Sequence, residues 1–319
     1  MRISGTNWIG VCLIGVLLSA STVSAAFTKH HWYKLDDRAE NTILTDSGTG
    51  EEDADWVVGT GQTIRDTNLD SVTGLVNTSP SRAMNFADEH HVYTRHVAAT
   101  TRASFAAVFS TNFAVSMWVR PVDGQPASVE RVFGYIELDG EGGNIVDKVI
   151  ASILADGRVN LRYTVAANAN EARAQTQNVI FNDGGGQTKN LVFVGFKDVT
   201  GVDGLAIWVD GVRQTLGANN GNTSNINEGL WATWEGETTT TSGNSKGPNF
   251  GAMLTIWPPG PDSATLFYNG VMDEITTWTW DNADSANIQT ELIDVLFSDV
   301  LVSVDRTARS RPRYSGGGR

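Results

Sequence analysis

Short runs in which apolar and polar residues alternate recur along most of the chain. In the run of residues 112–120, every second residue from Phe113 to Val119 is apolar and would lie on one face of a strand. The pattern predicts strands at residues 31–35, 112–120, 131–138, 148–154, 158–165, 190–196, 205–209, 249–257, 265–268 and 271–280. Turn-forming Asp-Gly and Asn-Gly pairs separate several of these runs. Many strands without alternating helices indicate an all-β protein, an antiparallel β-sandwich or jelly roll.

One helix is predicted near the C-terminal end. Its evidence is a set of apolar residues at helical spacing, namely Ile288, Leu292, Val295 and Leu296. Asp284 and Ser285 are candidates for its N-cap, and Phe297 is its expected end. The stretches 219–229 and 236–248 are rich in small polar residues and glycine, so we expect them to be long surface loops.

The N-terminal residues indicate export. Arg2 precedes an apolar run at residues 8–18, and small residues follow it, so residues 1–25 resemble a signal peptide cleaved after Ala25 or Ala26. A membrane anchor is the alternative, but the apolar run is shorter than the ~20 residues that a spanning helix needs. We therefore divide the chain into a signal peptide (1–25), a sandwich domain (26–298) and a C-terminal tail (299–319).

Composition and charge exclude several classes of function. Cys12, the only cysteine, lies in the signal peptide, so the mature chain has no disulfide and no thiolate for zinc or nucleophilic catalysis. The formal net charge is −13, and the last 15 residues hold five of the arginines, so the rest of the chain is more acidic still. An acidic body argues against binding nucleic acid or anionic lipid.

Several motifs, taken in order, resemble a known family. They are WYKLDD at 32–37, DSGTG at 46–50, AMNF at 83–86, NFAVSMWVRP at 112–121, LAIWVDGV at 205–212 and GVMDEITTWTW at 270–280. In this order they resemble the laminin G-like (LamG) branch of the concanavalin A-like lectin/glucanase superfamily. The resemblance implies a concanavalin A-like jelly roll over most of the mature chain. Insertions between residues 37 and 83 and between 213 and 249 depart from the family, so its loop sites cannot be transferred.

Two adjacent carboxylates, Asp273 and Glu274, stand beside Trp278 and Trp280. Neighbouring residues on a strand point to opposite faces, so the two carboxylates would not act together on one glycosidic bond. The carboxylate strand of the glucanases and the signatures of the polysaccharide lyases are not found. The resemblance implies calcium binding, for which Asp46 and Asp273 are the candidate ligands. A solvated acidic loop is the alternative interpretation.

The tryptophans fall into two groups. Trp118, Trp208, Trp278 and Trp280 lie in predicted strands, and we expect them to pack against the sandwich. The others, Trp231, Trp234 and Trp257, flank the predicted loop at 236–248 and could form an aromatic shelf on which a sugar ring stacks. A loop anchored by its own tryptophans is the alternative.

These observations predict a secreted, non-enzymatic recognition or adhesion module for glycans or surface polymers, with calcium as a candidate cofactor. The tail suggests an alternative, because an apolar run at 299–304 precedes an arginine-rich segment that could pair with a neighbouring subunit. In that case the protein would be a structural subunit of an extracellular filament or surface coat. A polysaccharide-acting enzyme is the third and weaker alternative. Two N-glycosylation sequons begin at Asn77 and Asn222.

Overall fold

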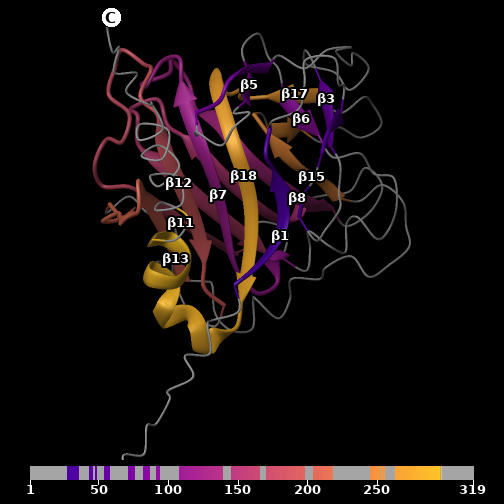
Figure 1. The fold of residues 1–319 in the computed structure, drawn as a ribbon, viewed down its shortest axis with the longest axis vertical. Coiled ribbons are helices and arrows are strands. Elements are labelled where there is room, and N and C mark those ends of the chain that lie inside the picture. Colours follow the sequence, from indigo (N-terminus) through magenta and orange to yellow (C-terminus); the bar gives the residue numbers. More distant parts are fainter. Residues whose placement is uncertain are drawn as a thin grey trace, which may run out of the picture.

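A computed structural model shows that the chain folds into two antiparallel β-sheets packed face to face (Figure 1). The structure describes residues 27–35, 43–45, 47–48, 54–57, 71–75, 82–86, 91–93, 108–138, 145–165, 170–197, 204–217, 245–251, 253–255, 263–294 and 296. The predicted antiparallel sandwich is confirmed. Within the described residues, no helix is long and apolar enough to cross a membrane.

The first sheet has the strand order β14-β13-β12-β7-β18-β5-β4, and β1 also pairs with β18. Its strands are β1 (Thr28–Tyr33), β4 (Ser71–Thr73), β5 (Arg82–Asn85), β7 (Asn112–Pro121), β12 (Lys189–Gly195), β13 (Leu205–Val209), β14 (Val212–Arg213) and β18 (Gly270–Trp280). The predicted strand at 205–209 is matched residue for residue. The long β18 lies between β7 on one side and both β1 and β5 on the other (Figure 1).

The second sheet has the order β11-β10-β9-β8-β15-β6-β3-β2. Its strands are β2 (Ile43–Leu44), β3 (Ala54–Val57), β6 (His91–Tyr93), β8 (Glu130–Leu138), β9 (Ile145–Ile153), β10 (Val159–Val165), β11 (Asn170–Gln175) and β15 (Ser245–Phe250). A separate hairpin pairs β16 (Met253–Thr255) with β17 (Ser263–Thr265). The strands predicted at 249–257 and 265–268 are therefore wrong in extent, because the first is divided at Gly251 and the second ends at Thr265.

The core lies between the two sheets and follows from strand alternation. Phe113, Val115, Met117 and Val119 are all buried in it, as their spacing predicts. Strands β10 and β12 contribute their own alternate residues to the same cluster, which also contains rings in contact across the sheets, such as Tyr33 against Phe250. Apolar burial of this kind is the main stabilising contribution to the fold.

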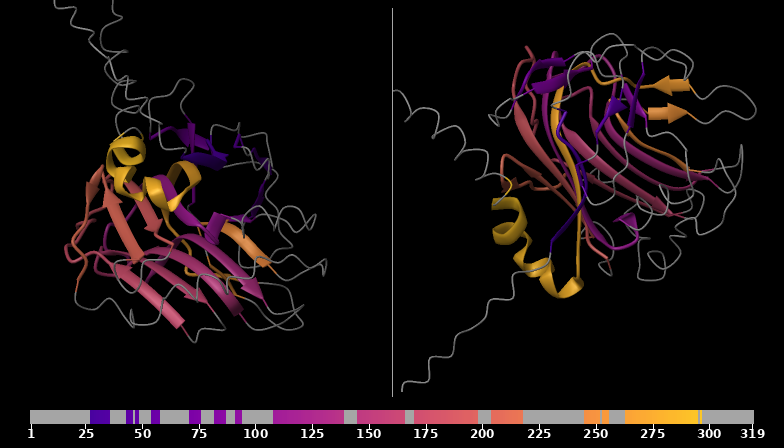
Figure 2. Two further views of the ribbon diagram at one scale, coloured as in Figure 1. Left: turned by 90° about the horizontal axis from the view of Figure 1, so that it is seen from below. Right: turned by 45° about the vertical axis from the view of Figure 1, so that its right-hand side comes forward.

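The predicted helix is present but is not an α-helix. It consists of η2, a 3-10 helix at Asn282–Asn287, and η3, a π-helix at Gln289–Ile293. Asp281 precedes the first turn, so the predicted N-caps Asp284 and Ser285 lie inside it. The wider π turn lets Ile288, Leu292 and Ile293 all face the sheet, and all three are buried. This helical segment packs outside the layer that contains β18 (Figure 2).

Candidate functional site

The adjacent carboxylates of β18 diverge, as the sequence predicts, although a β-bulge contributes to this. The register of β18 against β7 shifts between Asp273 and Thr276, and Glu274 has a positive φ of 50°. Asp273 is 2% exposed, and its Oδ2 accepts a hydrogen bond of 2.9 Å from the backbone N–H of Leu75. Glu274 instead accepts a hydrogen bond from Trp32 Nε1. Asp273, opposite Trp118 on the outer side of the sheet, thus fixes the backbone at Leu75.

The other site residues predicted from the sequence cannot be compared with the structure. Asp46, Trp231, Trp234 and Trp257 lie outside the described residues, as does the tail at 299–319. Within the described part of the chain, no three acidic, histidine or cysteine side chains lie close enough to hold a metal ion. Calcium binding and assembly through the tail therefore stay predictions.

Trp208, Trp278 and Trp280 of the first sheet pack against the sandwich, as predicted, and Trp32 is covered by lysines. Trp208 and Trp280 are buried under the helical segment. On β1, the Nζ atoms of Lys29 and Lys34 lie 3.8 Å and 4.1 Å from the centroid of the Trp32 ring. Lys29 Nζ is also 4.9 Å from the ring centroid of Trp278. Because the chain's own lysines lie over these rings in cation–π contacts, the rings do not form an open shelf for a sugar.

A different set of polar side chains gathers on the outward face of the second sheet. On β10, Val159, Leu161 and Tyr163 belong to the core, so alternation turns Asn160, Arg162 and Thr164 to the opposite face. Cross-strand register then shows which residues of the neighbouring strands share this outward face. Among them are Arg131 (β8), Lys148 (β9), Arg162 (β10) and Arg173 (β11), and we call this outward side of β8–β11 the cationic face.

The register places these groups in rows across the four strands. In one row, Arg131 lies beside Ser152, which lies beside Asn160, which lies beside Gln175. In the next, Arg162 stands directly opposite Arg173. In the third, Lys148 is beside Thr164, and the residue paired with Thr164 on β11 is Glu171. Cations, amides and hydroxyls thus share, with the carboxylate residue Glu171, a surface about 14 Å wide, since neighbouring strands lie about 4.7–4.9 Å apart.

Most of these polar groups are buried, which is unusual for an outward face. Arg131, Lys148, Ser152, Asn160, Thr164 and Gln175 are buried, whereas Arg162 and Arg173 are partly exposed. Arg131 Nη1 donates a hydrogen bond to Ser152 Oγ. Asn160 is 5% exposed, and its Oδ1 has no hydrogen-bond partner in the structure. An unsatisfied buried amide costs free energy, so a feature of this kind calls for an explanation.

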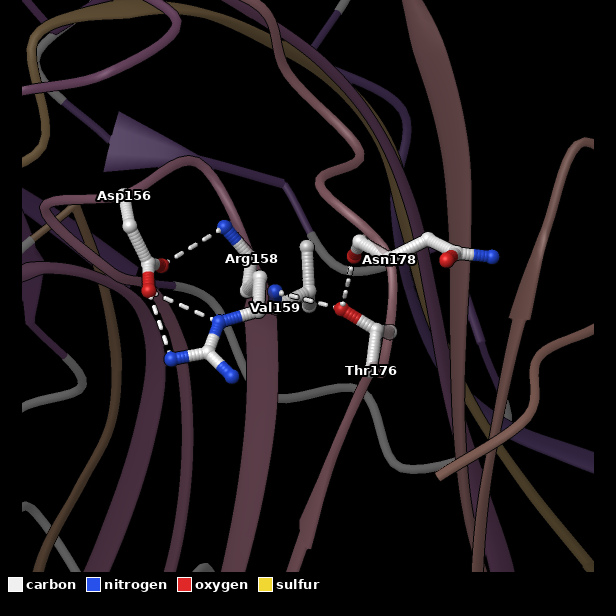
Figure 3. A network of polar contacts seen from close by, with 5 residues as sticks. All are labelled: Asp156, Arg158, Val159, Thr176 and Asn178. Carbon is white, nitrogen blue, oxygen red and sulfur yellow. Dashed lines mark hydrogen bonds and ion pairs between the residues drawn. The ribbon is translucent and has the colours of Figure 1, made fainter. Parts of the chain in front are cut away.

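Two turns at one end of the sheet hold this face in register (Figure 3). Asp156 accepts hydrogen bonds from the backbone N–H and Nε of Arg158, at 3.1 Å and 2.7 Å, and closes the turn between β9 and β10. The Arg158 hydrogen bond holds the pKa of Asp156 below its usual value. Thr176 Oγ1 accepts from the backbone N–H of Val159 and donates to the carbonyl of Asn178. This ties β10 to the end of β11 and fixes Asn160 opposite Gln175.

Sequence reasoning missed this face. The run at 158–165 alternates polar with apolar residues and is predicted as a strand, but the sequence does not show which strands lie beside it. Strand β11 was not predicted, because its inward residues are only Ala172 and Ala174. The available signal was alternation of Arg, Asn, Gln and Thr with inward apolar residues on successive strands.

Comparison with known proteins finds only distant similarity to solved structures. No family model matches the chain, and no curated protein does. The native heptameric SAP-like pentraxin from Limulus polyphemus is similar at 12% identity and a TM-score of 0.33, covering 52% of this chain and 63% of its own.

Two further solved structures are similar in fold. The Trypanosoma rangeli sialidase in complex with 2,3-difluorosialic acid is 15% identical with a TM-score of 0.43, covering 85% of this chain and 33% of its own. The Ruminococcus gnavus IT-sialidase CBM40 is 7% identical with a TM-score of 0.41, covering 65% and 96%. The chain therefore spans less than two thirds of the pentraxin and a third of the sialidase. At such identities and TM-scores, the likeness supports no inference about function.

Proposed function

We propose that this protein is a secreted, non-enzymatic recognition module that binds glycans or surface polymers on its cationic face. The observation that carries the proposal is the gathering of buried polar groups on the outward side of β8–β11. The cations of this face have contacts inside the chain, whereas the buried Asn160 Oδ1 has no hydrogen-bond partner in the structure. A polyhydroxylated ligand would supply both donors and acceptors to such a surface.

Binding without catalysis is supported by the kinds of side chain on this face. Its described side chains offer guanidinium, ammonium, amide and hydroxyl groups, which orient a ligand by hydrogen bonds. The two carboxylates of β18 are engaged within the chain, since Asp273 accepts from the Leu75 backbone and Glu274 from Trp32. Hydrolysis of a glycosidic bond would require two carboxyl groups flanking that bond.

The proposal is tested by incubating the full secreted chain with a panel of immobilised polysaccharides. We expect at least one immobilised polysaccharide to retain the protein. When the same polysaccharide is incubated with the protein in solution, the chain length of the polysaccharide, measured by size-exclusion chromatography, should stay constant. Release of oligosaccharides would show an enzyme instead. Retention should fall for the double variant Arg162→Gln/Arg173→Gln, whereas Arg213→Gln, an exposed arginine of β14 in the other sheet, should bind as wild type.

We keep calcium as part of the proposal, with Asp46 and Asp273 as its ligands. If Asp273 holds the ion, added calcium should raise the melting temperature of the wild type. Asp273→Asn keeps an oxygen that can accept from Leu75 N–H but lacks the charge, so the calcium-dependent rise should vanish in it. If calcium does not change the melting temperature of the wild type, the proposal of a calcium site is wrong.

A further inference from the structure

The segment that leads into β18 contains a chemically reactive pair, Asn269 followed by Gly270. Asn269 is exposed, and no hydrogen bond within the described part of the chain holds its side-chain amide. Among the asparagines that the structure describes, it alone precedes a glycine. The other Asn-Gly pair of the sequence, at 220–221, lies outside the described residues. The amide of Asn269 is therefore available to react with the backbone that follows it.

An asparagine before a glycine can react with its own main chain. The Gly270 backbone nitrogen loses its proton to hydroxide and attacks Cγ of Asn269, which closes a five-membered succinimide ring. The side-chain nitrogen takes up a proton from water and leaves as ammonia. Water then adds to one of the two ring carbonyls and opens the ring to aspartate or to isoaspartate. A following glycine favours the reaction, because it has no Cβ to shield the attacking nitrogen.

The fold itself requires the glycine at position 270. A Cβ at Gly270 would lie 2.5 Å from the carbonyl oxygen of Arg120 and 2.7 Å from Cα of Pro121, both on the paired strand β7. These are backbone atoms, so a larger residue could be accommodated only by moving β7. The close approach of β7 and β18 thus fixes the residue that makes Asn269 reactive.

The other exposed asparagines of this end of the sandwich lack that feature. Asn178 and Asn182 are exposed as well, but Val179 and Asp183 follow them. A side chain on the following residue hinders the approach of its backbone nitrogen to Cγ. These two asparagines therefore serve as internal references for the reactivity of Asn269.

Aspartates before glycines form the same ring more slowly. The described residues include four of them, Asp123, Asp156, Asp183 and Asp210. An ionised carboxylate is a poorer electrophile than an amide, because its negative charge is shared over both oxygens. Asp156 and Asp210 also accept hydrogen bonds, from Arg158 Nε at 2.7 Å and from the Asn190 N–H at 2.9 Å. Asn269 is thus the most reactive of the described positions.

The backbone at Asn269 makes contacts that the product would disturb. Its N–H donates to the Glu130 carboxyl, and its carbonyl accepts from the Val122 N–H at 2.9 Å. The carbonyl of Gly270 accepts from the Phe86 N–H at 2.7 Å. In isoaspartate the main chain runs through Cγ, so the carbonyl that faces Val122 leaves the main chain and one atom is added before Gly270. The two carbonyls can then no longer keep both partners.

We propose that Asn269 is a site of spontaneous deamidation, which converts the folded protein with time into a form with aspartate or isoaspartate at the entry to β18. The co-reactant is water, and the net change is the release of ammonia. The new carboxylate joins two others, since Asp123 lies close enough to act electrostatically on Glu130, to which the Asn269 N–H donates. The isoaspartate form is less stable than the original chain, because the hydrogen bonds to Val122 and Phe86 are disturbed.

The test is to age the full secreted chain at 37 °C, at pH 6 and at pH 8, and to map its peptides by mass spectrometry. We expect the peptide that contains Asn269 to gain the mass difference between OH and NH₂, severalfold faster than those with Asn178 and Asn182. The gain should be faster at pH 8, because the attacking nitrogen must lose its proton. Labelling with an isoaspartyl methyltransferase should place isoaspartate at the same peptide.

The matched control is Asn269→Gln, which keeps an exposed amide but would have to close a six-membered ring, so this position should stay unmodified. The aged wild type should melt at a lower temperature than the fresh protein, and the aged Asn269→Gln variant should lose less.

Three results would contradict the proposal. In the first, Asn269 stays intact in the folded chain while a peptide of residues 264–273 is modified, which would show that the turn protects it. In the second, Asn178 or Asn182 reacts as fast as Asn269. In the third, isoaspartate accumulates without any change in melting temperature, so the entry to β18 tolerates it. None of these results bears on glycan binding by the cationic face.

Discussion

The outward faces of the two sheets are built from opposite kinds of residue. On the first sheet, Val192, Val194 and Trp208 face outward and are covered by Leu292 and Ile293 of the helical segment. On the second sheet, the outward residues of β8–β11 include cations, amides and hydroxyls beside the apolar Ile150 and the acidic Glu171, and most of the polar ones are buried as well. Burial of side chains therefore contributes differently to the free energy of folding on the two sides of the sandwich.

The difference lies in what burial contributes to the free energy of folding. Each Å² of apolar surface removed from water contributes about 25 cal/mol, so the helical segment stabilises the first sheet simply by covering it. Burying a polar group without a hydrogen bond costs free energy, and a buried charge costs more. Apolar burial therefore explains the first face, whereas the contacts of the buried polar groups have to offset a desolvation cost on the second.

The largest loss of stability is expected on the first sheet, where apolar burial stabilises the fold. Trp208 is 1% exposed beneath the helical segment, and its Nε1 donates to Gln289 Oε1 at 2.7 Å. Trp208→Ala should lower the free energy of unfolding by about 3–5 kcal/mol, as large-to-small core substitutions do. Chemical denaturation measures this loss. Val212→Ala on the neighbouring β14, where the side chain is 63% exposed, should change it little. A Trp208 variant as stable as the wild type would show that the helical segment covers the sheet without stabilising it.

Glu130 is a buried charged residue on the inner face of the second sheet. It neighbours Arg131 on β8, but its side chain points between the sheets beside Ile153. It is 8% exposed and its Oε2 has no hydrogen-bond partner in the structure. Burial, opposed by a hydrogen bond from the Asn269 backbone and reinforced by Asp123, raises its pKa from 4.5 to about 7. The same carboxyl raises the pKa of the buried Tyr268 further, after burial itself.

The sign of the pH effect follows from this shift. The folded chain keeps the Glu130 proton up to about pH 7, whereas the unfolded chain releases it near pH 4.5. Its stabilising contribution is thus complete below about pH 4.5 and is lost as the pH rises to about 7. Glu130→Gln cannot ionise, so at pH 8 it should exceed the wild type by about 1–3 kcal/mol in free energy of unfolding.

The measurement is the difference in free energy of unfolding between Glu130→Gln and the wild type, taken once at pH 5 and once at pH 8. Taking the difference cancels the self-repulsion of the acidic body, which also grows with pH in both proteins. Asp156→Asn is a matched control at an exposed carboxylate whose pKa is lowered, so it should show no gain at pH 8. If the difference in free energy of unfolding were the same at pH 5 and pH 8, the pKa of Glu130 would not be raised in the folded chain.

Much of the fold could be predicted from the sequence, because strand alternation encodes it locally. The strand at 112–120 was identified from alternation and ended by Pro121, and the strand at 205–209 was identified as an apolar run ended by Asp210-Gly211. The short strands β2, β3 and β4 could not be found this way, since two to four residues are too few to show a period. The 3-10 and π turns of η2 and η3 also escaped, because packing on the sheet decides them.

The candidate site could be predicted only in part, for a physical reason. Asp273 and Glu274 were expected from alternation to point to opposite faces, and in the structure they contact different partners, the Leu75 backbone and Trp32. The cationic face depends on the order of strands in the sheet, which brings Arg131 of β8 into the same surface as Arg173 of β11. No local pattern states which strands are neighbours, so residues far apart in the sequence were not grouped.

The smallest expected effect is also the most direct test of the comparison. Asn160 and Asn112 are both buried amides on strands, but Asn112 Nδ2 donates to the Trp280 carbonyl at 3.0 Å and its Oδ1 accepts from Lys197 N–H at 2.7 Å. Asn112→Val should therefore cost about 1–3 kcal/mol, because it leaves those partners buried and unsatisfied. Asn160→Val removes an amide oxygen that has no partner, so denaturation should show the free energy of unfolding unchanged or raised by up to about 1 kcal/mol. If Asn160→Val costs as much as Asn112→Val, the amide of Asn160 serves the fold, and the outward face of the second sheet is structural like that of the first.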